Sequence, residues 1–271
     1  MVCDGMGGAA AGEVASSLAV DAIYDKLMRD QWANMTRAEL AQRLIDAILY
    51  ANSAILQTAR ANREQSGMGT TCTAALLHDD VLLIGQVGDS RAYLIRNGTM
   101  YQMTKDQTLV NRLLEVGQIT PEEAVKFEHN HVILQALGVR EKVEPVLSAV
   151  ELMPGDGLLL CSDGLNDALT DEQINYYVHN AGSTEPAMIC KTLTDKACEA
   201  GANDNVTVIF ARFSGQGYGF TNPGAPVPYV QVPKEQLQNH MLLVRPPIES
   251  ADTTQVFGSF QLQGIIQEPK P

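Results

Sequence analysis

Two short β-rich runs, residues 91–95 and 99–103, meet near Asn97-Gly98, and this dipeptide is the strongest local constraint on the fold. Asn-Gly between two such runs predicts a tight hairpin, because its left-handed backbone matches the twist of paired antiparallel strands. Similar short runs bounded by turn residues recur at 70–77, 81–87, 143–152, 157–162 and 205–213. The sequence therefore predicts sheets built largely from antiparallel neighbours.

Helical patterns lie on both sides of these runs. Residues 12–30 carry apolar side chains at steps of four, which predicts an amphipathic helix: Ala15, Ala19, Ile23 and Leu27. A second helix is expected to begin at Thr36, with Glu39 completing a capping box. Further helices are predicted within ITPEEAVKF (residues 119–127), at Thr170-x-x-Gln173 and over 185–200. Hairpins combined with segregated helices favour an α+β sandwich over a parallel doubly wound sheet.

The charge balance limits the possible partners. The net charge of −13 argues against nucleic acid and against an anionic membrane surface, but it is compatible with a cation site. No apolar run approaches the ~20 residues of a membrane helix, and the N-terminus lacks the layout of a secretory signal. Five scattered cysteines without C-x-x-C spacing indicate reduced thiols in a cytoplasmic protein and make a structural zinc site unlikely: Cys3, Cys72, Cys161, Cys190 and Cys198.

The composition changes after Phe213. From residue 214 to residue 271 the chain is rich in Gly, Pro and Gln, and no helical or strand period persists. This composition predicts a flexible, partly extended tail that follows one domain covering residues 1–213.

Four aspartates stand where a predicted strand meets a turn: Asp4, Asp89, Asp163 and Asp204. A cluster of carboxylates is the environment of hard divalent cations such as Mg2+ and Mn2+. Asp-Gly and Asn-Asp are also ordinary turn sequences, favoured by local hydrogen bonding, so the spacing alone leaves a metal site and a set of structural turns equally open.

Five motifs follow one another along the chain: VCDGMGGAAAGEVAS, GMGTTCTAAL, GQVGDSRAYLIRNG, LLLCSDGLNDALTDEQI and GANDNVTVIFARF. Together they resemble the ordered motif set of the metal-dependent protein serine/threonine phosphatases (the PPM, or type 2C, family) in its bacterial branch. The resemblance runs from Val2 to Phe213. It implies a PPM-type α-β-β-α sandwich, in which two mostly antiparallel sheets are flanked by helix pairs. It also implies dephosphorylation of phosphoserine and phosphothreonine in proteins, at a centre of two Mn2+ or Mg2+ ions.

The resemblance assigns roles residue by residue. Asp4 matches the carboxylate that bridges the two metal ions, and Gly5 matches the residue whose backbone carbonyl binds one of them. Asp163 and Asp204 match the other ligands of this core, and Asp89 matches a ligand of a third, weaker ion. The catalytic residues expected on this basis are Asp4, Asp163 and Asp204, acting through a metal-activated water. Residues 104–135 match the flap beside the active site and are called the flap below.

The chemistry is consistent with this assignment. Phosphomonoester hydrolysis is very slow without a catalyst, and two cations can activate water and neutralise the transferring phosphoryl group. The sequence GDSRA is not the G-x-S-x-G elbow of serine hydrolases. No cysteine has an arginine six positions later, so the loop of cysteine-dependent phosphatases is absent.

The chain departs from the family pattern at several positions. It begins at the Asp-Gly-Met-Gly-Gly motif, so the usual N-terminal strand segment is missing, with its phosphate-binding arginine and its Asn-Glu-Asp. A truncated phosphatase or one with impaired phosphate binding would both explain this. Met6 stands where many eukaryotic members carry a histidine proposed as general acid, so the leaving-group proton must come from water or elsewhere. His131, in the flap, could touch a third metal ion, but a lone histidine in a loop is more often merely exposed.

The expected function is that of a signalling phosphatase that counteracts a cognate serine/threonine kinase. The alternative is a catalytically impaired module that binds phosphoproteins. In the tail, acidic residues flank Thr253-Thr254, and Phe257 follows. Once phosphorylated, such a segment could be read by a phosphothreonine-binding domain, although incidental threonines in a tail are the simpler interpretation.

Overall fold

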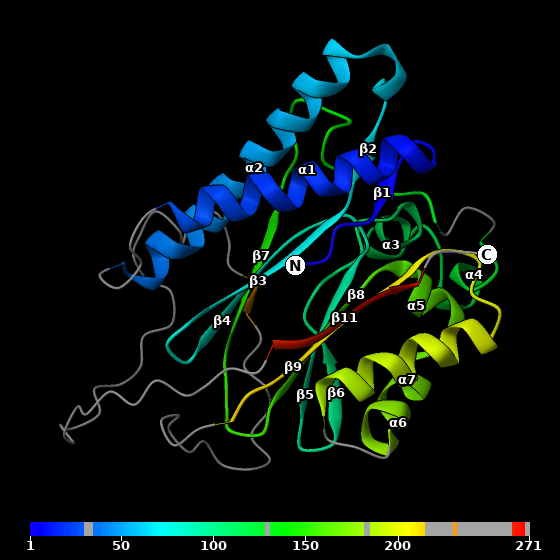
Figure 1. Ribbon diagram of the computed structural model, residues 1–271. Helices are drawn as coiled ribbons and strands as arrows, with labels where there is room; N and C mark the ends of the chain where they lie inside the picture. Colours follow the sequence, from blue (N-terminus) through cyan, green and yellow to red (C-terminus); the bar gives the residue numbers. More distant parts are fainter. Residues whose placement is uncertain (30–34, 128–130, 182–184, 215–229, 232–261, 269–271) are drawn as a thin grey trace.

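The computed structural model describes residues 1–29, 35–127, 131–181, 185–214, 230–231 and 262–268. Two sheets lie face to face between two sets of helices (Figure 1). The first sheet has the order β10-β7-β4-β3 and the second the order β11-β9-β8-β5-β6, with all neighbours antiparallel. The strands are β3 (Cys72–His78), β4 (Val81–Val87), β5 (Arg91–Arg96), β6 (Thr99–Gln102), β7 (Val146–Glu151), β8 (Gly157–Cys161), β9 (Val206–Arg212), β10 (Val230–Gln231) and β11 (Leu262–Glu268). The expected α-β-β-α sandwich is confirmed.

The predicted hairpin joins β5 to β6. Arg96 pairs with Thr99, and Asn97 and Gly98 between them have φ angles of 51° and 80°. Two successive positive φ angles are the requirement of a type I′ turn, which Asn and Gly meet at low cost. The local sequence therefore determines this strand pairing.

Several helices begin at the capping signals that the sequence predicts, but the first begins at Ala9, three residues before its predicted start, and has no side-chain cap. Helix α1 covers Ala9–Met28, and α2 covers Arg37–Ala61 behind a complete capping box of Thr36 and Glu39. The same box opens α6 (Asp171–Asn180), with Thr170 and Gln173, and Pro186 opens α7 (Pro186–Glu199). The short helix predicted after Thr120 is α4 (Pro121–Ala124).

Three apolar layers hold the sandwich together. One lies between α1, α2 and the first sheet and includes Ile23, Leu44 and Leu83. A second lies between the sheets and includes Leu82 and Leu160. The third packs the second sheet against the C-terminal helices: Leu159, Leu165, Ile174, Leu193 and Phe210. In these strands alternate residues face opposite layers, as the two-residue period of a strand requires.

Several elements were not expected from the sequence. Helices α3 (Leu109–Glu115) and α5 (Asp163–Ala168) are short, and β1 (Gly5–Met6) pairs with β2 (Gly69–Thr70) over two residues each. Strands β10 and β11 lie within residues 214–271, where the sequence analysis placed only a tail, and they pair with β7 and β9. The division at residue 213 stays a prediction. In the part of the chain that the structure describes, no helix is long and apolar enough to cross a membrane.

Candidate active site

The four predicted aspartates come together at one end of the sandwich. Asp4 lies just before β1, Asp89 lies between β4 and β5, Asp163 follows β8, and Asp204 lies just before β9. Their electrostatic coupling shows the convergence, because the charges of Asp163, Asp204 and Asp89 all act on the Asp4 carboxyl. Segments that are far apart in sequence thus place their acidic residues in one region.

Two threonines, one at the end of β2 and one just before β3, fix the backbone of Asp4. The Asp4 amide donates to Thr71 Oγ1 at 2.9 Å. The Asp4 carbonyl accepts from Thr70 Oγ1 at 2.8 Å and from the Thr71 amide at 2.8 Å. Thr71 Oγ1 also lies 2.7 Å from Ser90 Oγ, next to Asp89. One buried hydroxyl therefore links the loops that carry Asp4 and Asp89.

Close backbone contact holds the turn after Asp4 against helix α1. A Cβ added at Gly5 would lie 2.0 Å from the Gly12 carbonyl oxygen, and one at Gly12 would lie 2.6 Å from the Gly5 carbonyl oxygen. No real side chain tolerates such distances, so both positions require glycine. This packing fixes the Asp4-Gly5 turn, where a backbone carbonyl is expected to bind metal.

The turns that carry Asp163 and Asp204 are joined in the same way. Ser162 Oγ donates to the Asn205 carbonyl at 3.1 Å and accepts from the Thr207 amide at 3.0 Å. A Cβ at Gly164 would lie 2.4 Å from the Asn205 carbonyl oxygen. Ser162 and Gly164 thus hold the start of α5 against the loop before β9, and this contact sets the spacing of the two carboxylates.

The electrostatics favour a positive charge at this end of the sandwich. Burial, followed by the charge of and a hydrogen bond to Asp163, raises the pKa of Asp4 to about 8. Burial and the charge of Asp163 also raise the pKa of Asp89 to about 7. Clustered carboxylates repel one another when ionised, and each gains affinity for a proton or a cation. The cluster therefore stores an electrostatic cost that a bound cation would relieve.

One buried atom points to the same conclusion. Asp163 Oδ1 is buried and has no hydrogen-bond partner among the described residues. A buried polar atom without a partner is costly, and a missing ion is one common explanation. Asp204, by contrast, is exposed, so the site opens to solvent on that side.

The donor set fits Mg2+ or Mn2+. These hard cations prefer oxygen ligands, and Mg2+ usually keeps several waters while binding one or two carboxylates. Among the described residues, no three Asp, Glu, His or Cys side chains are arranged to enclose a single ion. Carboxylates shared between ions, a backbone carbonyl and water are consistent with that finding.

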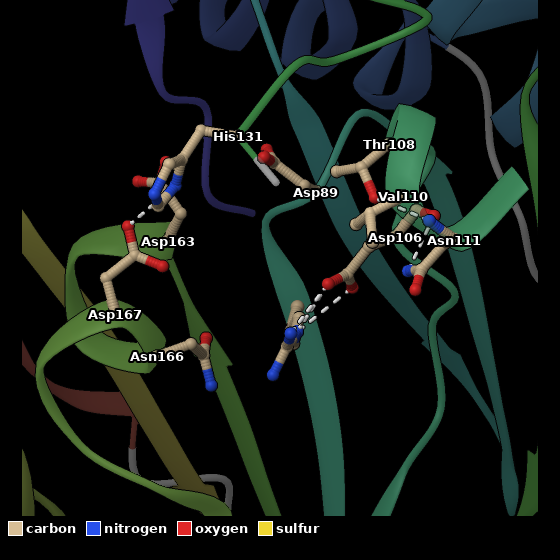
Figure 2. A pocket seen from close by; sticks show the side chains of 10 residues that line it. Asp89, Asp106, Thr108, Val110, Asn111, His131, Asp163, Asn166 and Asp167 are labelled. Atoms are coloured by element: carbon tan, nitrogen blue, oxygen red, sulfur yellow. Dashed lines mark hydrogen bonds and ion pairs between the residues drawn. The ribbon is translucent and has the colours of Figure 1, made fainter. Parts of the chain in front are cut away.

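A cleft of about 160 Å3 opens beside the aspartates (Figure 2). Its walls come from the end of the second sheet, from helix α5 and from the flap: Asp89, Arg91, Asp106, Thr108, Val110, Asn111, His131, Asp163, Asn166 and Asp167. The flap is tied to the Asp89 loop, because the Gly88 amide donates to Gln107 Oε1 at 2.8 Å and the Gln107 amide donates to the Gly88 carbonyl at 3.0 Å. The cleft is polar and mostly acidic, so an anionic group such as a phosphate needs bound cations to enter it.

Sequence reasoning missed several residues of this cleft. Arg91 and Asp106 form an ion pair in its wall, and Asp167 lies one helical turn after Asp163. The four-residue spacing of Asp163 and Asp167 would have placed both on one helix face, but only if α5 had been predicted. Asp106 stands in a polar stretch that gives no comparable signal.

Comparison with known proteins agrees with the geometry. The profile of the family described as "Protein phosphatase 2C" matches residues 1–194. The serine/threonine protein phosphatase PstP of Mycobacterium tuberculosis is 41% identical over 222 residues, which are 82% of this chain and 41% of that protein. The chain thus spans less than half the length of this relative. The serine/threonine phosphatase stp of Listeria welshimeri is 38% identical over 214 residues, covering 77% of this chain and 82% of the relative.

A solved structure is similar as well. The catalytic domain of the serine threonine protein phosphatase PstP, in complex with two manganese ions, superimposes with a TM-score of 0.68 at 40% identity. The match covers 79% of this chain and 86% of that one. At 40% identity the likeness supports a common family as well as a common fold.

Proposed function

Because this chain belongs to the protein phosphatase 2C family, we propose that it hydrolyses phosphoserine and phosphothreonine in proteins in a Mn2+- or Mg2+-dependent reaction. The observation that carries the proposal is the convergence of Asp4, Asp163 and Asp204 around a buried, unpartnered carboxylate oxygen. The names of the relatives and the manganese-bound neighbour support the same activity.

We assign the cation ligands to the residues of this cluster. Asp4, Asp163, Asp204 and the Gly5 carbonyl would hold two ions, and Asp89 would contribute to a third. When bound, such ions acidify the attacking water and offset the negative charge of the transferring phosphoryl group. No protein nucleophile is required, because the metal-bound water attacks phosphorus directly.

The residues of the chain itself hold the carboxylate ligands in position and leave them accessible to a substrate. Thr71, Ser162 and the glycines at 5 and 164 fix the carboxylates before any substrate arrives, so little reorganisation is needed during the reaction. Asp204 is exposed, so a side chain that projects from a protein surface can reach the aspartate cluster from solvent. These features favour a phosphorylated protein segment as substrate.

Two partners follow from this proposal. A phosphatase of this kind would oppose a serine/threonine kinase in a signalling pathway, and the reduced-cysteine composition favours a cytoplasmic setting. Thr253 and Thr254 lie outside the described residues. Their acidic flanks support the proposal that a phosphothreonine-binding domain reads the tail, which calorimetry with a tail peptide phosphorylated at Thr254 would test.

Mn2+-dependent hydrolysis of p-nitrophenyl phosphate and of a phosphothreonine peptide tests the activity. Asp163→Asn and Asp204→Asn are expected to lower turnover at least 100-fold and to weaken Mn2+ binding, because each removes an anionic ligand. Asp195→Asn is the matched control, since Asp195 lies on α7 in an exposed ion pair with Lys191. Asp89→Ala should lower turnover while the two-ion core stays bound.

The outcomes separate the two interpretations of the sequence. Wild-type turnover in Asp163→Asn would refute the metal assignment. If the wild-type chain bound the phosphopeptide without hydrolysing it, the protein would be a module that binds phosphoproteins and not an enzyme.

A further inference from the structure

We propose that His131 is the general acid that protonates the leaving oxygen of the phosphorylated side chain. The inference rests on the proposed function and adds a catalytic residue to it. An alkoxide of serine or threonine is a very poor leaving group, so its departure is faster when a positioned acid delivers a proton, typically by 10²–10⁴-fold.

The backbone around His131 is held in place beside the cleft. The Leu109 amide donates to the Val132 carbonyl at 2.8 Å, and the Leu134 amide donates to the Gln107 carbonyl at 2.8 Å. These bonds flank a bridge between Thr108 and Ile133. His131 is thus one residue from a segment that is anchored to the loop carrying the cleft wall.

The imidazole is oriented by a carboxylate from the opposite wall. Nδ1 of His131 lies 3.3 Å from Oδ2 of Asp167, and Figure 2 shows the two side chains facing each other next to Asp163. Nδ1–H directed at a carboxylate leaves Nε2 as the ring nitrogen available to a ligand. Because 62% of the His131 side chain is exposed, a substrate oxygen can approach that nitrogen.

The other side chains of the cleft are poorly suited to the role. The guanidinium of Arg91 is hydrogen-bonded to Asp106. Burial lowers the pKa of Arg91, but the hydrogen bonds to Asp106 and the neighbouring charges outweigh burial and raise this pKa above its ordinary value. Asp89 and Asp163 are assigned to cations. The amides of Asn111 and Asn166, the hydroxyl of Thr108 and the apolar Val110 do not release a proton near neutral pH. Imidazole is the side chain that gives up and regains a proton in this range.

The step balances. A water oxygen attacks phosphorus and the bond from phosphorus to the side-chain oxygen breaks, with its electron pair going to that oxygen. The oxygen takes the proton from His131 Nε2 and leaves as the free hydroxyl. The attacking water keeps one proton as part of the hydrogen phosphate product and releases the other to solvent, from which the imidazole is protonated again.

A series of leaving groups tests this role. p-Nitrophenolate departs readily without a proton, phenolate less so, and the alkoxide of a phosphoserine peptide needs one most. His131→Gln should therefore lower kcat about 100-fold for the peptide, less for phenyl phosphate and less than threefold for p-nitrophenyl phosphate. Asp167→Asn, which removes the orienting carboxylate, should show the same order with a smaller loss. His179→Gln, at an exposed site on α6, should change none of these rates.

The affinity of the metal-free chain for Mn2+, measured by calorimetry, separates this role from cation binding. An unchanged Mn2+ affinity in His131→Gln supports the proposal. Equal losses for all three substrates, no loss for the peptide, or a weakened Mn2+ affinity would each overturn it. A wild-type chain that hydrolyses none of the substrates would instead overturn the proposed function, and the role of His131 with it.

Discussion

Arg91 binds the carboxylate of Asp106 through two nitrogens. Nε lies 3.0 Å from Oδ1 and 2.9 Å from Oδ2, and Nη2 lies 2.6 Å from Oδ2. Nη1 donates to the hydroxyl of Tyr93 at 3.0 Å, and this hydroxyl donates to Asp171 at 2.9 Å. The network connects β5, the flap and helix α6, and it lies in the wall of the cleft.

Asp106→Ala is expected to destabilise the protein by about 3 kcal/mol, because it leaves a mostly buried guanidinium without its main partner. Only 25% of the Arg91 side chain and 10% of the Asp106 side chain are exposed, so we expect a cost close to that of breaking a buried ion pair. Urea denaturation measures the change. Arg112→Ala breaks an exposed pair with Glu115 and should cost less than about 1 kcal/mol. Similar small effects for both variants would show that the Arg91 network contributes little to stability.

A second ion pair stabilises the opposite end of the same sheet. Arg96 donates to both Asp156 oxygens, at 2.9 and 2.6 Å, with side-chain exposures of 5% and 2%. Asp156→Ala should therefore cost about 3–5 kcal/mol in unfolding free energy, since a buried charge loses its partner. Mn2+ affinity of the folded variant, measured by calorimetry, should not change, because β5 and β8 separate this pair from the aspartate cluster.

The double variant Arg96→Met with Asp156→Leu is the control for this pair. It removes both charges and should recover much of the lost stability. If the double variant recovered no stability, the loss in Asp156→Ala would come from other contacts. These are the hydrogen bonds from Arg96 to the Glu151 carbonyl and from the Met153 amide to Asp156.

Local signals predicted much of the fold. The turn at Asn97-Gly98 and the capping boxes at Thr36 and Thr170 each act within four residues, so the sequence alone determines them. Helix α5 was not predicted, because six residues are too few to show a helical period in the sequence. Strand β11 was not predicted, because its pairing with β9 uses backbone hydrogen bonds that nearly every residue can form.

The candidate site was predictable only in part. Each of the four aspartates follows or precedes a strand, which gave a local reason to select it. The pair of Arg91 and Asp106 and the contact of His131 with Asp167 join residues 15 and 36 positions apart, through loops without a recognisable pattern. Such contacts depend on how the flap packs against α5, and no local sequence pattern indicates that packing.

Gly164→Ala is expected to weaken Mn2+ binding at least tenfold. The new methyl group would lie 2.4 Å from the Asn205 carbonyl oxygen, so the turn carrying Asp163 must move away from the turn carrying Asp204. Calorimetric titration of the folded variant with Mn2+ measures the effect. A shift of a few tenths of an ångström between ligands is enough to lower affinity for an ion with strict geometry.

Gly155→Ala is the matched control. Gly155 has a φ angle of 92° with no atom within 4 Å of an added Cβ, and it lies at the far end of β8. This substitution should cost about 1 kcal/mol of stability through backbone strain and leave Mn2+ affinity unchanged. Equal Mn2+ affinity in both variants would mean that the contact with Asn205 does not set the ligand spacing.

The stability of the metal-free protein should decrease as the pH rises from about 5 to about 8. The pKa values of Asp4 and Asp89 are raised to about 8 and about 7 in the folded chain, against ordinary values near 4 when unfolded. Between these limits the folded state holds more protons than the unfolded state, so each rise in pH favours unfolding. The two pKa shifts together correspond to a loss of up to about 6 kcal/mol, measured by thermal unfolding in a chelator at several pH values.

Saturating Mn2+ should reverse this trend, because cations displace the same protons and bind more tightly as the pH rises. The double variant Asp4→Asn with Asp89→Asn should unfold with a much flatter pH dependence in the chelator, since its amides neither repel the remaining carboxylates nor bind protons. If the double variant and the wild type lost stability in parallel between pH 5 and pH 8, groups outside the aspartate cluster would control the pH dependence. A flat wild-type profile would show that Asp4 and Asp89 ionise without cost, and the electrostatic reason for a cation at this site would then be lost.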